Sequence, residues 1–179
     1  MIHLIDVRIA DWLLHYRVGW LTEFFLLVTA LTTSASLLVL GAALLSACLF
    51  YGRYRAGQII LLGAGLAFVL QFILKIIILR PRPAAWPALI EVPGYSFPSG
   101  HALVGATTLG LIAYYLVHTR RGRKYQPWIW LITILVALII GLSRIYLGAH
   151  WASDVVAGFA LGAIISWLIV RFFNQRTVK

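Results

Sequence analysis

Two residues in the last third of the chain have types and spacing that suit catalysis: His150 and Asp154 lie four positions apart. At the start of a helix this spacing places both side chains on one face, where a carboxylate can hold the imidazole. A held imidazole has a fixed tautomer and an electron-rich second nitrogen, so it can act as a base or a nucleophile. An isolated pair of this kind is more often an interfacial ion pair, so the neighbouring residues decide the interpretation.

Three cationic residues are expected on the same side of the membrane as this pair: Lys75, Arg82 and Arg144. Ionisable groups at membrane depth are costly and usually functional. Only Glu91 and Asp154 are present on that side to neutralise them, so the cations need an added anion. Arginine binds phosphate oxygens in a bidentate manner and stabilises the charge that develops when phosphorus is attacked. The group therefore indicates a phosphoryl site.

The segment Pro98-Ser99-Gly100-His101 precedes an apolar run and predicts a helix amino terminus. Ser99 can cap this helix, and Gly100 allows the backbone amides to approach an anion closely. A simple helix cap would explain the serine equally well, but it would leave His101 without a role. His101 could protonate a departing oxygen as a general acid.

Together these residues resemble a known three-part signature, that of the type-2 phosphatidic acid phosphatases, whose superfamily includes the vanadium-dependent haloperoxidases. The resemblance covers residues 75–154. Its first part is Lys75, six residues and Arg82-Pro83, and its second part is the segment 98–101 described above. The third part is Ser143-Arg144, five residues, His150, three residues and Asp154.

The resemblance implies a role for each signature residue. His150 would be the nucleophile that forms a phosphohistidine, Asp154 its orienting partner and His101 the general acid. The phosphate would be held by Lys75, Arg82, Ser99, Gly100 and Arg144. The resemblance also implies catalysis without a metal or other cofactor, and the scarcity of carboxylates on this side agrees, because a two-metal site would need several.

The elements that must position these residues are membrane-spanning helices. Of the 179 residues, 62% are hydrophobic and 11% are charged, and the mean hydropathy is +0.94, which excludes an ordinary soluble domain. We expect an all-α integral membrane bundle forming a single membrane phosphatase domain over residues 1–179. Apolar runs predict five spans, at residues 34–50 with a start near Phe24, 56–79, 99–117, 128–147 and 150–170.

Residues 1–20 alternate charged and apolar side chains, which favours an amphipathic helix lying in the membrane interface. The alternative is a sixth, short span over residues 20–31, which would move the amino terminus to the other side. The segment lacks the basic-then-apolar order of a cleavable signal peptide. Cys48 lies inside an apolar run and is expected to be a core residue.

The basic residues predict the orientation of the bundle in a cell membrane. With five spans, the lysines and arginines of the short loops and of the carboxyl-terminal segment fall on one side of the membrane. The positive-inside rule assigns that side to the cytoplasm. The candidate site then faces the extracytoplasmic side. A nucleic-acid partner is not expected despite the formal charge of +10, because no soluble basic face is available. The basic residues on the cytoplasmic side are Arg53, Arg55, Arg120, Arg121, Arg123, Lys124, Arg171, Arg176 and Lys179.

Several residues outside the signature are expected to serve the membrane or the packing. Arg80 is expected to extend toward the lipid headgroups. Gly158 and Gly162 form a small-residue pair that predicts close helix packing. Four tryptophans are expected at the membrane boundary, where the one at position 151 could also shape a lipid entrance: Trp86, Trp128, Trp130 and Trp151.

The expected substrate is a lipid phosphomonoester or diphosphate, and the expected partners are this substrate and the membrane lipids. By analogy with small bacterial members of the family, undecaprenyl diphosphate comes first, followed closely by phosphatidylglycerol phosphate or phosphatidic acid. Lipid A 1-phosphate is an alternative. A different class, an anion or lipid transporter, would show polar residues continuing through the spans or an internal repeat, and the sequence shows neither. The oligomeric state stays open.

Overall fold

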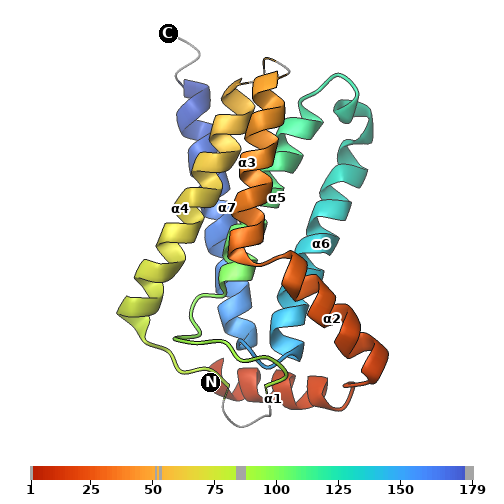
Figure 1. Ribbon diagram of the computed structural model, residues 1–179, viewed down its shortest axis with the longest axis vertical. Coiled ribbons are helices and arrows are strands. Elements are labelled where there is room, and N and C mark those ends of the chain that lie inside the picture. Colours follow the sequence, from red (N-terminus) through yellow and green to blue (C-terminus); the bar gives the residue numbers. More distant parts are fainter. Residues whose placement is uncertain (1, 51, 53, 84–87, 176–179) are drawn as a thin grey trace.

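The regular structure is helical throughout the described part of the chain. The computed structural model describes residues 2–50, 52, 54–83 and 88–175, and no strand occurs among them. The all-α prediction is therefore confirmed (Figure 1). The helices are α1 (Ile2–Leu14), α2 (Gly19–Leu31), α3 (Ser34–Phe50), α4 (Tyr54–Ile78), α5 (Gly100–Val117), the 3-10 turn η1 (Gly122–Tyr125), α6 (Gln126–Tyr146) and α7 (Ala152–Gln175).

Four helices are long and apolar enough to cross a membrane: α4, α5, α6 together with η1, and α7. The pair α2 and α3 meets the same criterion only when the two helices, bent by 52°, are taken together. Counted as one span, this pair brings the described spans to the predicted five. A separate sixth span over residues 20–31 is not supported, because α2 has only 13 residues where about 20 are needed.

The bend between α2 and α3 has a local cause in the sequence. Thr32 turns its hydroxyl back to the carbonyl of Val28 at 2.6 Å, and the hydroxyl of Thr33 accepts a hydrogen bond from the amide of Ser36 at 3.0 Å. Threonine side chains that bond to the backbone in this way end one helix and cap the next. The predicted span starting near Phe24 therefore starts earlier, at Gly19, and is broken in its middle.

Helix α5 lies at the centre of the bundle and contacts α3, α4, α6 and α7. Its closest neighbour is α7, as the glycine pair predicts. A Cβ atom added at Gly158 would lie 2.9 Å from the Cβ of Ala102, and one at Gly162 would lie 2.8 Å from the Cβ of Ala106. The small residues let the two backbones approach closely, so the packing interpretation is confirmed.

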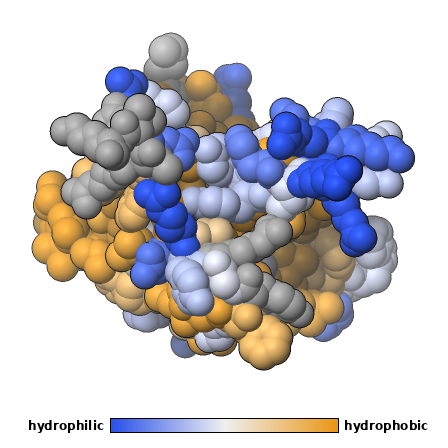
Figure 2. Space-filling model, turned by 90° about the horizontal axis from the view of Figure 1, so that it is seen from above, coloured by the Kyte–Doolittle hydropathy of each residue, from blue (hydrophilic) through white to orange (hydrophobic). Residues whose placement is uncertain are grey.

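The bundle has two chemically different ends. At one end α1 lies across the place where α4 and α6 finish and α5 and α7 begin (Figure 1). At the other end lie the α3–α4 and α5–α6 connections, and Figure 2 shows hydrophilic residues gathered there on the side of the α5–α6 connection. Among the basic residues expected there, Arg53, Arg176 and Lys179 lie outside the described residues.

Candidate active site

His150 lies in the connection between α6 and α7, two residues before α7 begins at Ala152. The sequence prediction started this helix near His150, two residues earlier than the structure does. The pair forms because Asp154, in the first turn of α7, turns back toward the connection and accepts a hydrogen bond from the amide of Trp151 at 3.0 Å. The side chains of His150 and Asp154 are 3% and 0% exposed, and Nδ1 of the histidine lies 3.6 Å from Oδ2 of the aspartate.

The guanidinium group of Arg82 lies beside the other ring nitrogen of His150. Its Nη1 is 3.4 Å from Nε2 of the histidine and donates to the carbonyl of Ala149 at 2.6 Å. The carbonyls of Gly94 and Pro93 accept two further hydrogen bonds, at 2.9 Å and 3.1 Å. Burial lowers the pKa of Arg82, but an arginine side chain keeps its charge in proteins. Three backbone carbonyls thus fix a cation next to the imidazole.

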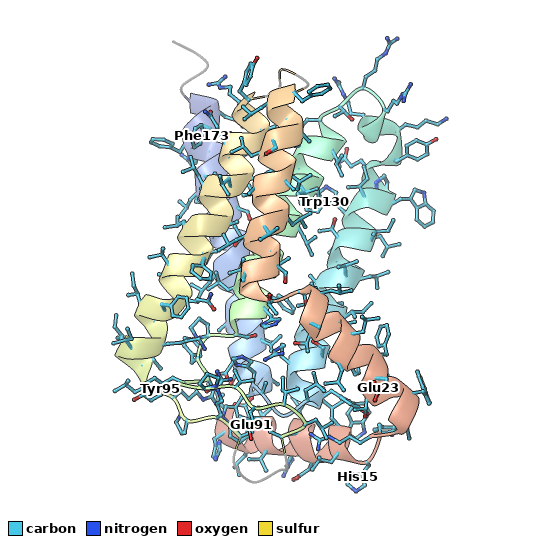
Figure 3. All side chains as sticks on the ribbon, in the orientation of Figure 1. His15, Glu23, Glu91, Tyr95, Trp130 and Phe173 are labelled. Atoms are coloured by element: carbon cyan, nitrogen blue, oxygen red, sulfur yellow. The ribbon has the colours of Figure 1, made fainter. Side chains whose placement is uncertain are left out.

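The other two predicted cations reach the same place from α4 and α6. Lys75 donates to the carbonyl of Tyr95 at 2.7 Å, and Figure 3 shows Tyr95 at the same end of the bundle as Glu91. Arg144 is 2% exposed and donates to the hydroxyl of Thr29 on α2. Within the described residues, Nε of Arg144 is buried and has no hydrogen-bond partner.

The burial of His150 and the charges gathered around it change the pKa of its imidazole. Burial lowers the pKa of its imidazole to about 4, Asp154 opposes this shift, and the charges of Arg144, Arg82 and Lys75 add to it. The imidazole is therefore neutral at physiological pH, with a lone pair available on one nitrogen.

The amino terminus of α5 provides the remaining predicted residues. Ser99 stands at the N-cap position, but its hydroxyl makes no capping hydrogen bond, so the predicted side-chain cap is wrong. Its backbone amide instead donates to the carbonyl of Asp154 at 3.1 Å, which ties α5 to α7. The hydroxyl of Ser99 is buried without a hydrogen-bond partner among the described residues. Gly100 is buried beside it as the first residue of α5.

His101 follows on the first turn of α5. Its Nε2 lies 3.4 Å from the hydroxyl of Thr29, and it is close enough to His150 and Arg144 to interact with both electrostatically. The structure thus brings all eight predicted residues to one end of the bundle. Buried donors without partners, the hydroxyl of Ser99 and Nε of Arg144, suit an anion that accepts hydrogen bonds from them.

Arg80 does not extend toward the headgroups, and this prediction is wrong. Its Nη1 lies 2.5 Å from Oδ1 of Asp154, and its Nη2 lies 2.6 Å from Oδ2 of Asp6 on α1. Two buried carboxylates compensate its charge better than a headgroup region would, because ion pairs are stronger where water is excluded. Asp6 and Thr29 were not predicted as site residues, since neither lies near a signature motif.

Trp151 is not a boundary anchor either. The side chain is 6% exposed, and its Nε1 donates to the carbonyl of Pro81 at 3.0 Å. This hydrogen bond holds the residues that follow α4 against the α6–α7 connection. Trp128 is 63% exposed, as an anchor would be, whereas Trp130 is half-buried and lines a hollow between α5, α6 and α7. Trp86 lies outside the described residues.

The described residues contain no group of three or more His, Cys, Asp or Glu side chains that could hold a metal ion. Two hollows on the described surface lie away from the signature residues. One, of about 500 Å³ and almost entirely apolar, lies between α5, α6 and α7. Another, of about 710 Å³, lies at the opposite end of the bundle near Arg55 and Arg120. The chemistry is therefore concentrated in the polar cluster beneath α1.

Comparison with known proteins gives consistent similarities. The profile of the PAP2 superfamily matches residues 56–178. Phosphatidylglycerophosphatase B of Bacillus subtilis is 36% identical over 157 residues, which cover 87% of this chain and 77% of the relative. An undecaprenyl-diphosphatase of Sulfolobus acidocaldarius is 33% identical over 131 residues, covering 64% of this chain and 58% of that protein.

Two solved structures have the same arrangement of helices. The crystal structure of a transmembrane PAP2-type phosphatidylglycerolphosphate phosphatase from Bacillus subtilis superposes with a TM-score of 0.90 at 33% identity, covering 97% of this chain and 86% of that one. The structure of Aquifex aeolicus LpxE superposes with a TM-score of 0.76 at 25% identity, covering 93% and 95%.

Proposed function

Because the chain belongs to the PAP2 superfamily and is a membrane lipid phosphatase, we propose that it hydrolyses its substrate through a covalent phosphohistidine on His150. The observation that carries this proposal is the environment of His150. A neutral buried imidazole directs Nδ1 toward Asp154 and Nε2 toward the guanidinium of Arg82. In-line attack on phosphorus requires a nucleophile that one neighbour orients and that a phosphate-binding cation faces from the other side.

In the first step Nε2 of His150 attacks phosphorus, and the bond from phosphorus to the lipid oxygen breaks. The proton on Nδ1 stays between the imidazole and Asp154, whose carboxylate stabilises the positive charge that forms on the ring. Arg82, Arg144 and Lys75 stabilise the charge on the phosphoryl oxygens, and the hydroxyl of Ser99 with the first amides of α5 adds uncharged donors.

The leaving oxygen needs a proton, and His101 is the proposed donor. The alcohol, or the lipid monophosphate if the substrate is a diphosphate, then departs. Water attacks the phosphohistidine, His101 accepts a proton from this water, and inorganic phosphate leaves. The enzyme returns to its starting state with no net gain or loss of protons, and the cycle calls for no metal ion.

The names of the two relatives support two substrates, phosphatidylglycerol phosphate and undecaprenyl diphosphate. By analogy with small bacterial members of the family, undecaprenyl diphosphate is the first expected substrate. The higher identity over a larger share of this chain supports phosphatidylglycerol phosphate, so we propose that both be assayed first, with phosphatidic acid and lipid A 1-phosphate after them.

We place the reaction on the extracytoplasmic face of the cell membrane. Outside the site, six described basic residues lie at the end of the bundle away from His150, and three, Arg8, Arg17 and Arg80, lie at the same end as His150. The six are Arg55, Arg120, Arg121, Arg123, Lys124 and Arg171. By the positive-inside rule that end faces the cytoplasm. Access of a membrane-impermeant thiol reagent to single cysteines placed at each end would test this orientation.

Phosphate release from this panel by the detergent-purified protein, with a chelator present, tests the proposed function. We expect His150→Ala to lose activity by about 1,000-fold or more, as when a covalent nucleophile is removed. His118→Ala is the matched control, because His118 is exposed at the opposite end and bonds only locally, to the carbonyl of Tyr114 at 2.6 Å. Near-parental release by His150→Ala would reject the mechanism.

A further inference from the structure

Helix α1 lies outside residues 56–178, the part of the chain that matches the PAP2 profile. It nevertheless lies across the end of the bundle that holds the catalytic cluster and packs on α6 and α7 (Figure 1). Most of its residues are exposed or half-buried. Among residues 2–14, all of which the structure describes, Asp6 alone is buried, with 1% of its side chain exposed.

A buried carboxylate is costly unless donors compensate it. Asp6 has three such contacts, and all of them come from the neighbourhood of the catalytic aspartate. Its Oδ2 accepts from Nη2 of Arg80 at 2.6 Å and from the hydroxyl of Ser153 at 2.6 Å. Its Oδ1 accepts from the amide of Ser153 at 2.8 Å. The residue next to Asp154 in the chain is therefore attached to α1.

Arg80 extends this attachment to Asp154 itself. Its Nη1 donates to Oδ1 of Asp154 at 2.5 Å and to the hydroxyl of Ser153 at 2.7 Å, while Nη2 bonds Asp6. The planar guanidinium thus holds two carboxylates in one fixed geometry. Oδ2, the other oxygen of Asp154, faces His150. The orientation of Oδ2 is therefore set by two bonds: the one from Arg80 to Oδ1 and the one from the amide of Trp151 to Oδ2 itself.

The second carboxylate also matters for charge. If Arg80 paired with Asp154 alone, its full charge would act on that carboxylate and weaken it as an acceptor for the imidazole proton of His150. Asp6 takes a share of the guanidinium charge, so Asp154 keeps more of its negative potential. A positioning network of this kind acts through another residue and never contacts the substrate.

From these contacts we propose that Asp6 and Arg80 are positioning residues for the phosphatase reaction, and that α1 completes the active site by fixing the carboxylate of Asp154 against His150. The inference rests on the proposed function for its link to turnover. The physical link between Asp6 and His150 can be measured without turnover.

The test combines kinetics with NMR spectroscopy of the full-length protein in detergent. Asp6→Asn is expected to lower kcat by about tenfold to a hundredfold, the usual effect of losing an outer partner, with a change in KM of less than about threefold. In the Asp154→Asn background the same substitution should change kcat by less than about twofold, because residues that act as one unit are not additive. Asp11→Asn, on the same helix but exposed, is the matched control.

The second readout is the set of ring 15N signals of His150, assigned by their loss in His150→Ala; the chain has only five histidines. Asp6→Asn should shift these signals, and Asp11→Asn should not. Arg80→Lys keeps the charge but cannot hold two carboxylates in a planar fork, so it should reproduce both effects and gives a result even if Asp6→Asn folds poorly.

Unchanged His150 signals in both Asp6→Asn and Arg80→Lys, with equal losses of kcat in the parental and Asp154→Asn backgrounds, would overturn the inference. Such a result would mean that α1 has only a structural role. A parent protein that releases no phosphate from any lipid would overturn the proposed function instead, and the His150 spectra would still decide whether Asp6 and Arg80 position the pair.

Discussion

Oδ2 of Asp154 lies 3.6 Å from Nδ1 of His150, a few tenths of an ångström beyond a normal hydrogen bond. No other described atom bonds this ring nitrogen. The aspartate is itself held by the amide of Trp151 and by Arg80. The imidazole is therefore the part of the pair that can move, and catalytic hydrogen bonds of this kind often shorten only when the substrate is bound.

Asp154→Asn should lower kcat by about 1,000-fold or more, because an amide can present the wrong group to Nδ1 and cannot stabilise a positively charged imidazole. Substrate binding should change little, since the cations that hold phosphate are still present. Steady-state kinetics with the best substrate of the panel gives both values. Unchanged kcat with a large rise in KM would contradict an orienting role.

The pH dependence of kcat/KM should report the unusual state of His150. A pKa lowered to about 4 leaves the imidazole neutral down to about pH 5, so the loss of activity from protonation of His150 should centre near pH 4 instead of 6.5. Lys75→Gln removes one of the charges that lower this pKa, so its acid limb should move to higher pH.

Lys124→Gln, at the opposite end of the bundle, is the matched control and should keep the parental acid limb. Measurements with two substrates separate the ionisation of the enzyme from that of the lipid phosphate. An acid limb near pH 6.5 that does not move in Lys75→Gln would show that His150 is not the group observed.

Thr29→Val should reduce kcat/KM by about tenfold or more, because a hydrogen bond to a charged group contributes about 1.5–3 kcal/mol. The hydroxyl of Thr29 accepts from Arg144 and lies 3.4 Å from Nε2 of His101, so it orders two site residues at once. Valine preserves the shape and removes only the hydroxyl. Thr133→Val, whose hydroxyl bonds locally to Ile129 at 2.7 Å, should retain parental kinetics. Equal effects of the two substitutions would contradict the role of Thr29.

Gly162→Ala should lower the thermal midpoint of unfolding in detergent. The added Cβ would lie 2.8 Å from both the Cβ of Ala106 and the carbonyl oxygen of Leu103, so α5 and α7 must separate. Overpacking of this kind costs about 1–3 kcal/mol. Gly65→Ala in α4 meets no atom within 4 Å and should leave the midpoint unchanged or slightly raised. Parental stability of Gly162→Ala would show that the α5–α7 contact adapts.

The sequence alone determined the membrane bundle and the principal residues of the site. The spans could be predicted because a bilayer requires about 20 apolar residues per crossing, and the composition of a helix records this directly. The signature residues from Lys75 to Asp154 could be predicted because they stand at helix ends, within short stretches of fixed spacing. That spacing brings them to one membrane face whatever the detailed packing.

Only the tertiary structure decided which contacts hold these residues in place. Asp6 meets Arg80 across 74 positions and Ser153 across 147 positions, and no local pattern records such a contact. Whether a serine caps a helix, a tryptophan reaches the interface or an arginine faces lipid depends on the neighbours that packing supplies, as at Ser99, Trp151 and Arg80. A charge lowers its free energy by finding a compensating partner, and in a bundle that partner can come from any helix.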